Sequence, residues 1–151
     1  MQIKTMTKNE ALEIIKWQYD EPYDFYNFPN PEQYELEILN ENYRTQYFYS
    51  VYENNELIGL YEIHVEDNIA TLGLGMKPDK TGQGNGQQFV ENAIHFIKTQ
   101  YPEVMIIDIA VVSFNERAMK VYERCGFTHY DDVLMMSYST LHEFVKMKKE
   151  I

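Results

Sequence analysis

The segment KTGQGNG at residues 80–86 carries more information about the fold than any other stretch of the chain. It lies between a β-rich run that ends at Met76 and an amphipathic run that follows Gly86, which predicts strand, loop and helix in that order. Alternating glycines allow consecutive backbone N–H groups to point into one concavity, and the helix adds unpaired N-terminal donors and a positive dipole end. A pyrophosphate suits such a site, while a glycine-rich turn without a ligand explains the same residues equally well.

Two other classes of phosphate-binding loop fit this segment less well. A Walker loop requires Gly-Lys-Ser/Thr, whereas Gln87 and Gln88 follow Gly86. A dinucleotide site matches in one respect, because Asp108 stands about 20 residues beyond the loop, where such sites have a ribose-binding acid. That fold, however, places its loop after the first strand, and here three predicted strands come first. We rank both classes low.

The hydrophobic periodicity on either side of the loop predicts an α+β fold with a mixed sheet and the order α-α-β-β-β-α-β-α-β(-β). Polar turns at Asn54-Asn55 and Asp67-Asn68 join the first three strands into an antiparallel meander. Residues 143–149 suit either a strand or a helix end. The expected helices cover about residues 8–19, 30–39, the stretch from Gly86 to Pro102, and 115–124; the expected strands cover 46–53, 56–66, 69–76, 104–112 and the chain from Phe127 onward.

Length and charge narrow the class of protein. The 151 residues suit a single domain, residues 1–151. Thirteen Lys and Arg against 24 Asp and Glu give a net charge of -11, which argues against a nucleic-acid partner and favours a cationic or amine-bearing substrate. The single cysteine, Cys125, excludes a disulfide framework and a multi-thiolate zinc site. Without a long apolar run or a secretory signal, we expect a cytoplasmic protein with no membrane partner.

From Asn68 to Phe127 the sequence resembles the GNAT superfamily of acyl-CoA-dependent N-acyltransferases. The family signature Arg/Gln-x-x-Gly-x-Gly/Ala corresponds to residues 81–86, preceded by the frequent Met-x-Pro as Met76-Lys77-Pro78, with Thr81 in place of Arg or Gln. Residues 115–127 match the family pattern Asn-x-x-Ala-x-x-x-Tyr-x-x-x-Gly-Phe. The ending at residues 144–147 resembles the family's last strand, which favours a strand there. Thr81 removes one side-chain contact to the pyrophosphate and leaves the backbone cradle intact.

The resemblance implies a GNAT fold, in which a mostly antiparallel sheet flanked by helices contains a central parallel pair of strands, residues 69–76 and 104–112, that splays apart. The pantetheine arm of acetyl-CoA, the co-substrate, would lie between them, and no metal is required. Backbone amides at residues 74–76 would face the thioester carbonyl. The implied cofactor-binding residues are Leu74, Gly75, Met76, Thr81, Gly82, Gln83, Gly84, Asn85, Gly86, Gln87, Asn115 and Tyr122.

The implied reaction is attack of a neutral amine on the thioester, with Tyr122 protonating the leaving thiolate. The same tyrosine suits the core of an amphipathic helix, and Asn115 suits a helix N-cap. For the general base, Glu62 and His64 are the first candidates because they share a face of one predicted strand. Glu21 and Asp24 come next, and a water relay is equally credible. Cys125 is expected to be a small buried residue.

The loop from Glu21 to Pro29 falls where the family places substrate-facing residues. Acids interleaved with rings suit an ammonium group through charge and cation–π contact, and we expect this role for Tyr23, Asp24, Phe25 and Tyr26. An aromatic loop packed over the sheet is the alternative. The amine is a small metabolite, an antibiotic, or a peptide N-terminus or lysine, bound by a monomer or homodimer. A non-catalytic acyl-CoA-binding domain of the same fold is the competing function.

Overall fold

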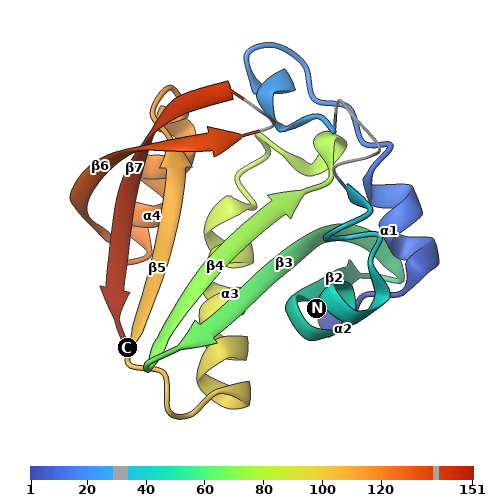
Figure 1. Ribbon diagram of the computed structural model, residues 1–151, viewed down its shortest axis with the longest axis horizontal. Helices are drawn as coiled ribbons and strands as arrows, with labels where there is room; N and C mark the ends of the chain where they lie inside the picture. Colours follow the sequence, from blue (N-terminus) through green and yellow to red (C-terminus); the bar gives the residue numbers. More distant parts are fainter. Residues whose placement is uncertain (29–33, 138–139) are drawn as a thin grey trace. The chain divides into compact units, whose positions relative to one another are not determined.

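The computed structural model describes residues 1–28, 34–137 and 140–151, and its sheet has the strand order β1-β2-β3-β4-β5-β7-β6. The helices are α1 (Lys8–Ile14), α2 (Glu41–Tyr47), α3 (Gly86–Gln100) and α4 (Glu116–Arg124), with 3-10 turns η1 (Tyr23–Tyr26) and η3 (Pro78–Lys80) (Figure 1). The strands are β1 (Gln2–Thr5), β2 (Phe48–Glu53), β3 (Glu56–Glu66), β4 (Ile69–Met76), β5 (Ile106–Val112), β6 (Thr128–Ser137) and β7 (Thr140–Glu150).

The sheet is mixed and mostly antiparallel, which confirms the predicted fold class. β1 pairs with β2, β2 with β3, β5 with β7 and β6 with β7, all antiparallel. The parallel pair is β4 and β5, in register from Ile69 opposite Ile106 to Thr71 opposite Asp108. The strand favoured at the end of the chain is also confirmed, because residues 143–149 lie within β7.

The chain forms two compact units, each with its own core. The first comprises Met1–Glu62 and Leu74–Thr81, and the second comprises Ile63–Gly73 and Gly82–Ile151. In the first unit, α1 and the segment after Tyr34 pack apolar side chains on β2 and β3; this cluster includes Met6, Ala11, Ile14, Trp17, Tyr34, Ile38, Phe48 and Leu57. In the second, α3 buries the predicted stripe of Phe89, Val90, Ala93, Ile94 and Ile97. The assignment of the whole chain to one domain stays a prediction.

The turns of the meander form where the sequence predicts them. Asn54 and Asn55 have φ of 50° and 64°, and Asp67 and Asn68 have φ of 51° and 65°. Two consecutive residues in the left-handed region define the tight turn that suits the twist of a β-hairpin, and Asn and Asp tolerate this conformation best. β3 and β4 consequently begin and end at the predicted residues. None of the helices among the described residues is long and apolar enough to cross a membrane.

Two predictions about the N-terminal third are wrong, and one strand was missed. α1 ends at Ile14 rather than Tyr19, because residues 16 and 17 close tighter turns onto Glu13 and Ile14 and bury Trp17 in the core. In the helix expected over 30–39, residues 30–33 lie outside the described residues and 34–39 form turns. The helix lies further on, as α2, where the Asn40 side chain accepts from the Tyr43 N–H (2.9 Å). β1 was not expected.

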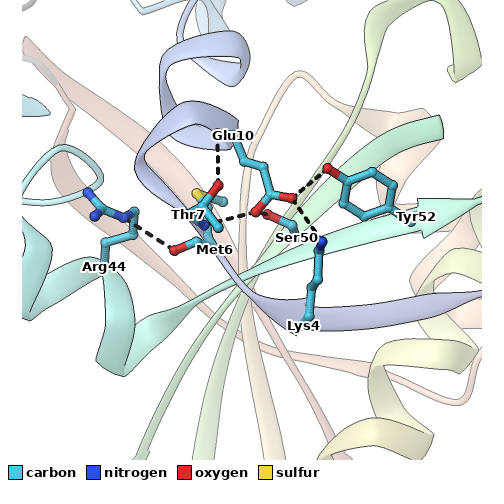
Figure 2. A network of polar contacts seen from close by, with 7 residues as sticks. All are labelled: Lys4, Met6, Thr7, Glu10, Arg44, Ser50 and Tyr52. Carbon is cyan, nitrogen blue, oxygen red and sulfur yellow. Dashed lines mark hydrogen bonds and ion pairs between the residues drawn. The ribbon is translucent and has the colours of Figure 1, made fainter. Parts of the chain in front are cut away.

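A buried carboxylate joins β1, α1 and β2 in the first unit (Figure 2). Glu10 is 6% exposed and accepts hydrogen bonds from the Thr7 N–H (2.8 Å), the Ser50 hydroxyl (2.9 Å) and the Tyr52 hydroxyl (2.5 Å). Lys4 adds an ion pair at 3.6 Å. Burial raises the pKa of Glu10, but the hydrogen bonds from Thr7, Tyr52 and Ser50 outweigh it and hold this pKa below its usual value. The predicted capping box therefore also anchors two strands.

Replacing Glu10 by Gln removes the charge that these donors stabilise. We expect Glu10→Gln to lower the free energy of unfolding at pH 7 by about 1.5–3 kcal/mol, measured by urea denaturation. Because the folded pKa is lowered, the contribution is fully present above the unfolded pKa and is lost as the pH falls through the folded value. The difference between the wild type and this variant should therefore shrink below about pH 4.5. Glu13→Gln, an exposed change on the same helix, is the control, and an equal effect of the two variants would contradict the prediction.

Candidate functional site

The glycine segment adopts the backbone conformation that the sequence suggests for an anion cradle. Gly82 and Gly84 have φ of +69° and +80°, a region that side chains rarely enter. A Cβ on Gly84 would meet no atom of the described residues within 4 Å, so the outer side of the loop is open there. Asn85 is the N-cap of α3, and the uncharged Gln87 and Gln88 follow in its first turn. The loop is therefore open at Gly84, next to the N-terminus of α3.

Thr81 has a local structural role at the entry to this loop. Its hydroxyl donates to the carbonyl of Pro78 (2.7 Å), and its backbone N–H also points to that carbonyl (3.3 Å). The side chain thus caps η3, and its single hydroxyl proton is already used. Thr81 does not supply the donor that Arg or Gln would bring at this position.

α4 packs against the start of α3 in the second unit. A Cβ on Gly86 would lie 3.3 Å from Cγ2 of Val121, so only glycine fits here without moving that side chain. One turn further along α4, the thiol of Cys125 donates to the carbonyl of Gln87 (3.7 Å). Cys125 is 8% exposed, as expected of a small buried residue, and burial raises the pKa of its thiol. A buried, protonated thiol is a poor nucleophile.

The second motif is a capped helix that holds Tyr122 in place. Asn115 is the N-cap of α4, is 7% exposed, and accepts from the Ala118 N–H (3.1 Å). At the other end Gly126 has φ of +96°, the Gly126 N–H donates to Glu123 and the Phe127 N–H donates to the Tyr122 carbonyl (3.0 Å). This is a Schellman motif, and it brings the Phe127 ring edge-on to Tyr122 at 6.0 Å. The Tyr122 ring is 8% exposed.

In the first unit, the aromatic turn η1 lies beside the end of β4. The hydroxyl of Tyr19 donates to the carbonyl of Met76 (2.5 Å), and a Cβ on Gly75 would lie 3.9 Å from the same hydroxyl. The Tyr19 N–H donates to the Asn27 side chain (2.6 Å), and its ring lies edge-on to Tyr26 at 6.4 Å. Burial and the neighbouring Tyr26 raise the pKa of Tyr19 to about 12, so it stays a donor at neutral pH. Tyr19 thus connects the turn expected to face the substrate with the strand end expected to face the thioester.

Sequence reasoning missed Tyr19. It belongs to a run of aromatic residues between Trp17 and Tyr52, and no spacing distinguishes it from the others. Around it, the predicted substrate residues are partly accessible: Tyr23, Phe25 and Tyr26 are half-buried, while Asp24 is exposed. Leu74, Gly75 and Met76 are half-buried as well. A Cβ on Gly75 would make only ordinary contacts with Leu60, so packing by itself does not demand glycine here.

The candidate bases lie in different surroundings. Glu62, on β3, accepts a hydrogen bond from the Tyr43 hydroxyl (3.0 Å), and burial together with this carboxylate raises the pKa of Tyr43. His64 is half-buried on the same strand, in the part that belongs to the second unit. Glu21 and Asp24 are exposed. The general base therefore stays a prediction. The described residues contain no group of three or more His, Cys, Asp or Glu arranged to hold a metal ion.

The fold and the two motifs are those expected of the GNAT family, and comparison with known families agrees. The family model described as "Acetyltransferase (GNAT) family" matches residues 9–127, so the chain belongs to this family. Its acetyltransferases use acetyl-CoA as the acyl donor. No curated protein sequence matches the chain.

Several solved structures share the fold at low sequence identity. The aminoglycoside acetyltransferase AAC(6')-Ib, in complex with coenzyme A, has a TM-score of 0.77 at 18% identity, covering 99% of this chain and 94% of that one. A spermidine N-acetyltransferase SpeG chimera from Vibrio cholerae and hSSAT has a TM-score of 0.74 at 17% identity, covering 99% and 96%. The ribosomal-protein-S18-alanine N-acetyltransferase from Escherichia coli has a TM-score of 0.72 at 18% identity, covering 99% and 93%.

We expect Tyr19→Phe to loosen η1 without unfolding the chain. The change deletes one hydrogen bond to a backbone carbonyl, which typically contributes about 0.5–1.5 kcal/mol. Hydrogen exchange of the amides at residues 23–27 should become roughly 2- to 10-fold faster, because local opening becomes easier by that amount. Tyr130→Phe is the control, since it deletes a hydroxyl that donates to Asp108 (2.6 Å) in the other unit. Unchanged exchange at residues 23–27 in Tyr19→Phe would show that Tyr19 does not hold the turn.

Proposed function

We propose that this chain is an N-acetyltransferase that transfers the acetyl group of acetyl-CoA to a primary amine. The observation that carries the proposal is the open loop in which Gly82 and Gly84 adopt left-handed conformations immediately before the N-terminus of α3. Such a backbone suits the pyrophosphate of CoA, because N–H donors bind phosphate oxygens without adding the bulk of side chains. Family membership supports the same conclusion.

The cofactor roles follow from the chain's own donors. Backbone N–H groups of the loop and of the first turn of α3, residues 82–87, bind the pyrophosphate. Asn115 caps α4 and also binds the pantetheine or pyrophosphate region. Backbone N–H groups at residues 74–76 stabilise the charge that grows on the thioester oxygen during attack.

The chemistry requires two proton transfers. The nitrogen of a neutral amine forms a bond to the carbonyl carbon, and the carbon–sulfur bond breaks. Tyr122 donates its phenolic proton to the leaving sulfur, and the amine proton passes to Glu62, to His64 or to water. Tyr122 is 8% exposed, so its side chain loses little conformational freedom when it donates the proton. This favours proton donation by Tyr122 over donation by bulk water.

The acceptor is an amine that binds near η1. Tyr23, Phe25 and Tyr26 offer ring faces, and Asp24 offers a negative charge that attracts an ammonium group before it loses its proton. The net charge of -11 also steers cations toward the chain. Structural neighbours are named as acetyltransferases of spermidine, of an aminoglycoside and of a ribosomal-protein alanine. These names cover three kinds of amine acceptor.

Titration calorimetry with acetyl-CoA, ATP and NAD tests the cofactor. We expect binding of acetyl-CoA and negligible binding of the other two. Gly84→Asp should lose at least ten times more affinity than Gly84→Asn, because the two side chains share one shape and tolerate positive φ alike, and only Asp places a negative charge beside the phosphates. Wild-type binding of NAD or ATP in place of acetyl-CoA would overturn the proposal. Equal losses of acetyl-CoA affinity in both variants would show that the phosphates do not bind at this loop.

A thiol-release screen tests the reaction itself. It covers polyamines, aminoglycosides, amino acids and peptides with free N-termini, each with acetyl-CoA in excess. Thiol released in proportion to acetylated amine supports the enzyme. Binding of acetyl-CoA without turnover on any amine would instead support an acyl-CoA-binding domain of the same fold.

Once an accepted amine is known, Tyr122→Phe tests the general acid. We expect kcat to fall about 100-fold or more while the affinity for acetyl-CoA stays nearly unchanged, because the lost proton transfer affects the transition state and not cofactor binding. Tyr101→Phe, at the far end of α3, is the control for loss of a phenolic hydroxyl. A Tyr122→Phe variant with wild-type kcat would assign the proton to another group.

A further inference from the structure

We propose that Arg117, in the first turn of α4, supplies the side-chain cation for the pyrophosphate of acetyl-CoA that Thr81 does not provide. This inference rests on the proposed function and adds a specific residue to its cofactor site. A Cβ on Gly82 would lie 3.4 Å from Nη1 of Arg117, so the guanidinium lies against the backbone of the first left-handed glycine. Arg117 is exposed, and a guanidinium carries five N–H donors.

Helix packing explains why the guanidinium is there. Arg117, Val121 and Cys125 are four residues apart, so they form one stripe along α4. The stripe meets the loop and α3 in order: Arg117 at Gly82, Val121 at Gly86 and Cys125 at Gln87. Because the last two contacts are close, the register between the helices is set, and Arg117 is directed to the loop.

Electrostatics explain why a cation is needed at the loop. The chain carries a net charge of -11. A pyrophosphate brought to the loop is repelled by this charge, and backbone dipoles by themselves carry no net charge to offset it. A guanidinium presents a planar fork of donors that matches phosphate oxygens and stays charged at any physiological pH. Arg117 therefore does from α4 what the family's Arg would do from position 81.

Calorimetry on the full chain tests the assignment with coenzyme A and with 3'-dephospho-CoA, which keeps the pyrophosphate. We expect Arg117→Ala to weaken both ligands by the same factor, about 10- to 100-fold, as for one charge-assisted hydrogen-bonding group. Arg117→Lys should fall between this variant and the wild type, since it keeps the charge and loses the fork. Lys98→Ala is the matched control, because it removes one positive charge from the last turn of α3, about 18 Å along that helix from the loop. It should bind both ligands as the wild type does.

The outcomes separate this inference from the proposed function. If the wild type binds coenzyme A and Arg117→Ala binds it equally well, the inference falls and the proposed function stands. A loss seen with coenzyme A but not with 3'-dephospho-CoA would assign Arg117 to the 3'-phosphate and overturn the pyrophosphate assignment. If the wild type binds neither ligand, both proposals fall.

A rescue variant distinguishes a phosphate contact from a disturbance of helix packing. Thr81→Arg, added to Arg117→Ala, returns a guanidinium to the loop from the family's usual position without restoring any α4 contact. We expect it to recover most of the lost affinity for both ligands. Affinity that stays at the level of Arg117→Ala would mean that the guanidinium acted through the packing of α4, which contradicts the proposal.

Discussion

The close approach of α4 to the first turn of α3 is the constraint on which the second unit depends. It is possible because Gly86 has no side chain, and any Cβ there would press on Val121 at 3.3 Å. The contact sets the register along the stripe that ends at Cys125, and the Schellman motif at Gly126 then orients the adjacent Tyr122 ring against Phe127. Gly86 therefore lies where the loop proposed to hold phosphates meets the helix proposed to hold the general acid.

The first unit is organised differently, around the hydrogen bonds of Glu10 and Tyr19. Glu10 collects donors from an adjacent turn, from two positions of β2 and from β1, so that a four-residue edge strand is held by more than its backbone ladder. Tyr19 plays a comparable part at the other side of the same unit, where it links the Met76 carbonyl to Asn27 and Tyr26. A buried carboxylate such as Glu10 stabilises only where every strong hydrogen-bonding atom finds a partner, and the half-buried Tyr19 hydroxyl depends on its one carbonyl acceptor, which makes both sites sensitive to conservative changes.

Much of the fold was predictable because its signals are local. The hairpin turns at residues 54–55 and 67–68, the α3 stripe and the caps Asn115 and Gly126 each depend on residues only a few positions apart. The errors lie where distant partners decide. β1 has no distinctive pattern and exists because β2 offers it a ladder, from Gln2 opposite Tyr52 to Thr5 opposite Tyr49. α1 stops at Ile14 because burial of Trp17 outweighs the helical propensity of the residues after it.

The same division holds for the candidate site. The sequence by itself determined the positions of the glycine loop and of the Asn115 cap, because φ requirements and cap preferences depend on residue type. The role of Tyr122 came from the family motif and stays a prediction. Only the tertiary structure brought Arg117 to Gly82 and Tyr19 to Met76, residues 35 and 57 positions apart. It also revealed that the Thr81 hydroxyl is engaged by Pro78. The physical reason is that a charge or a hydroxyl on a long side chain acts wherever packing directs it, and packing is a property of the whole chain.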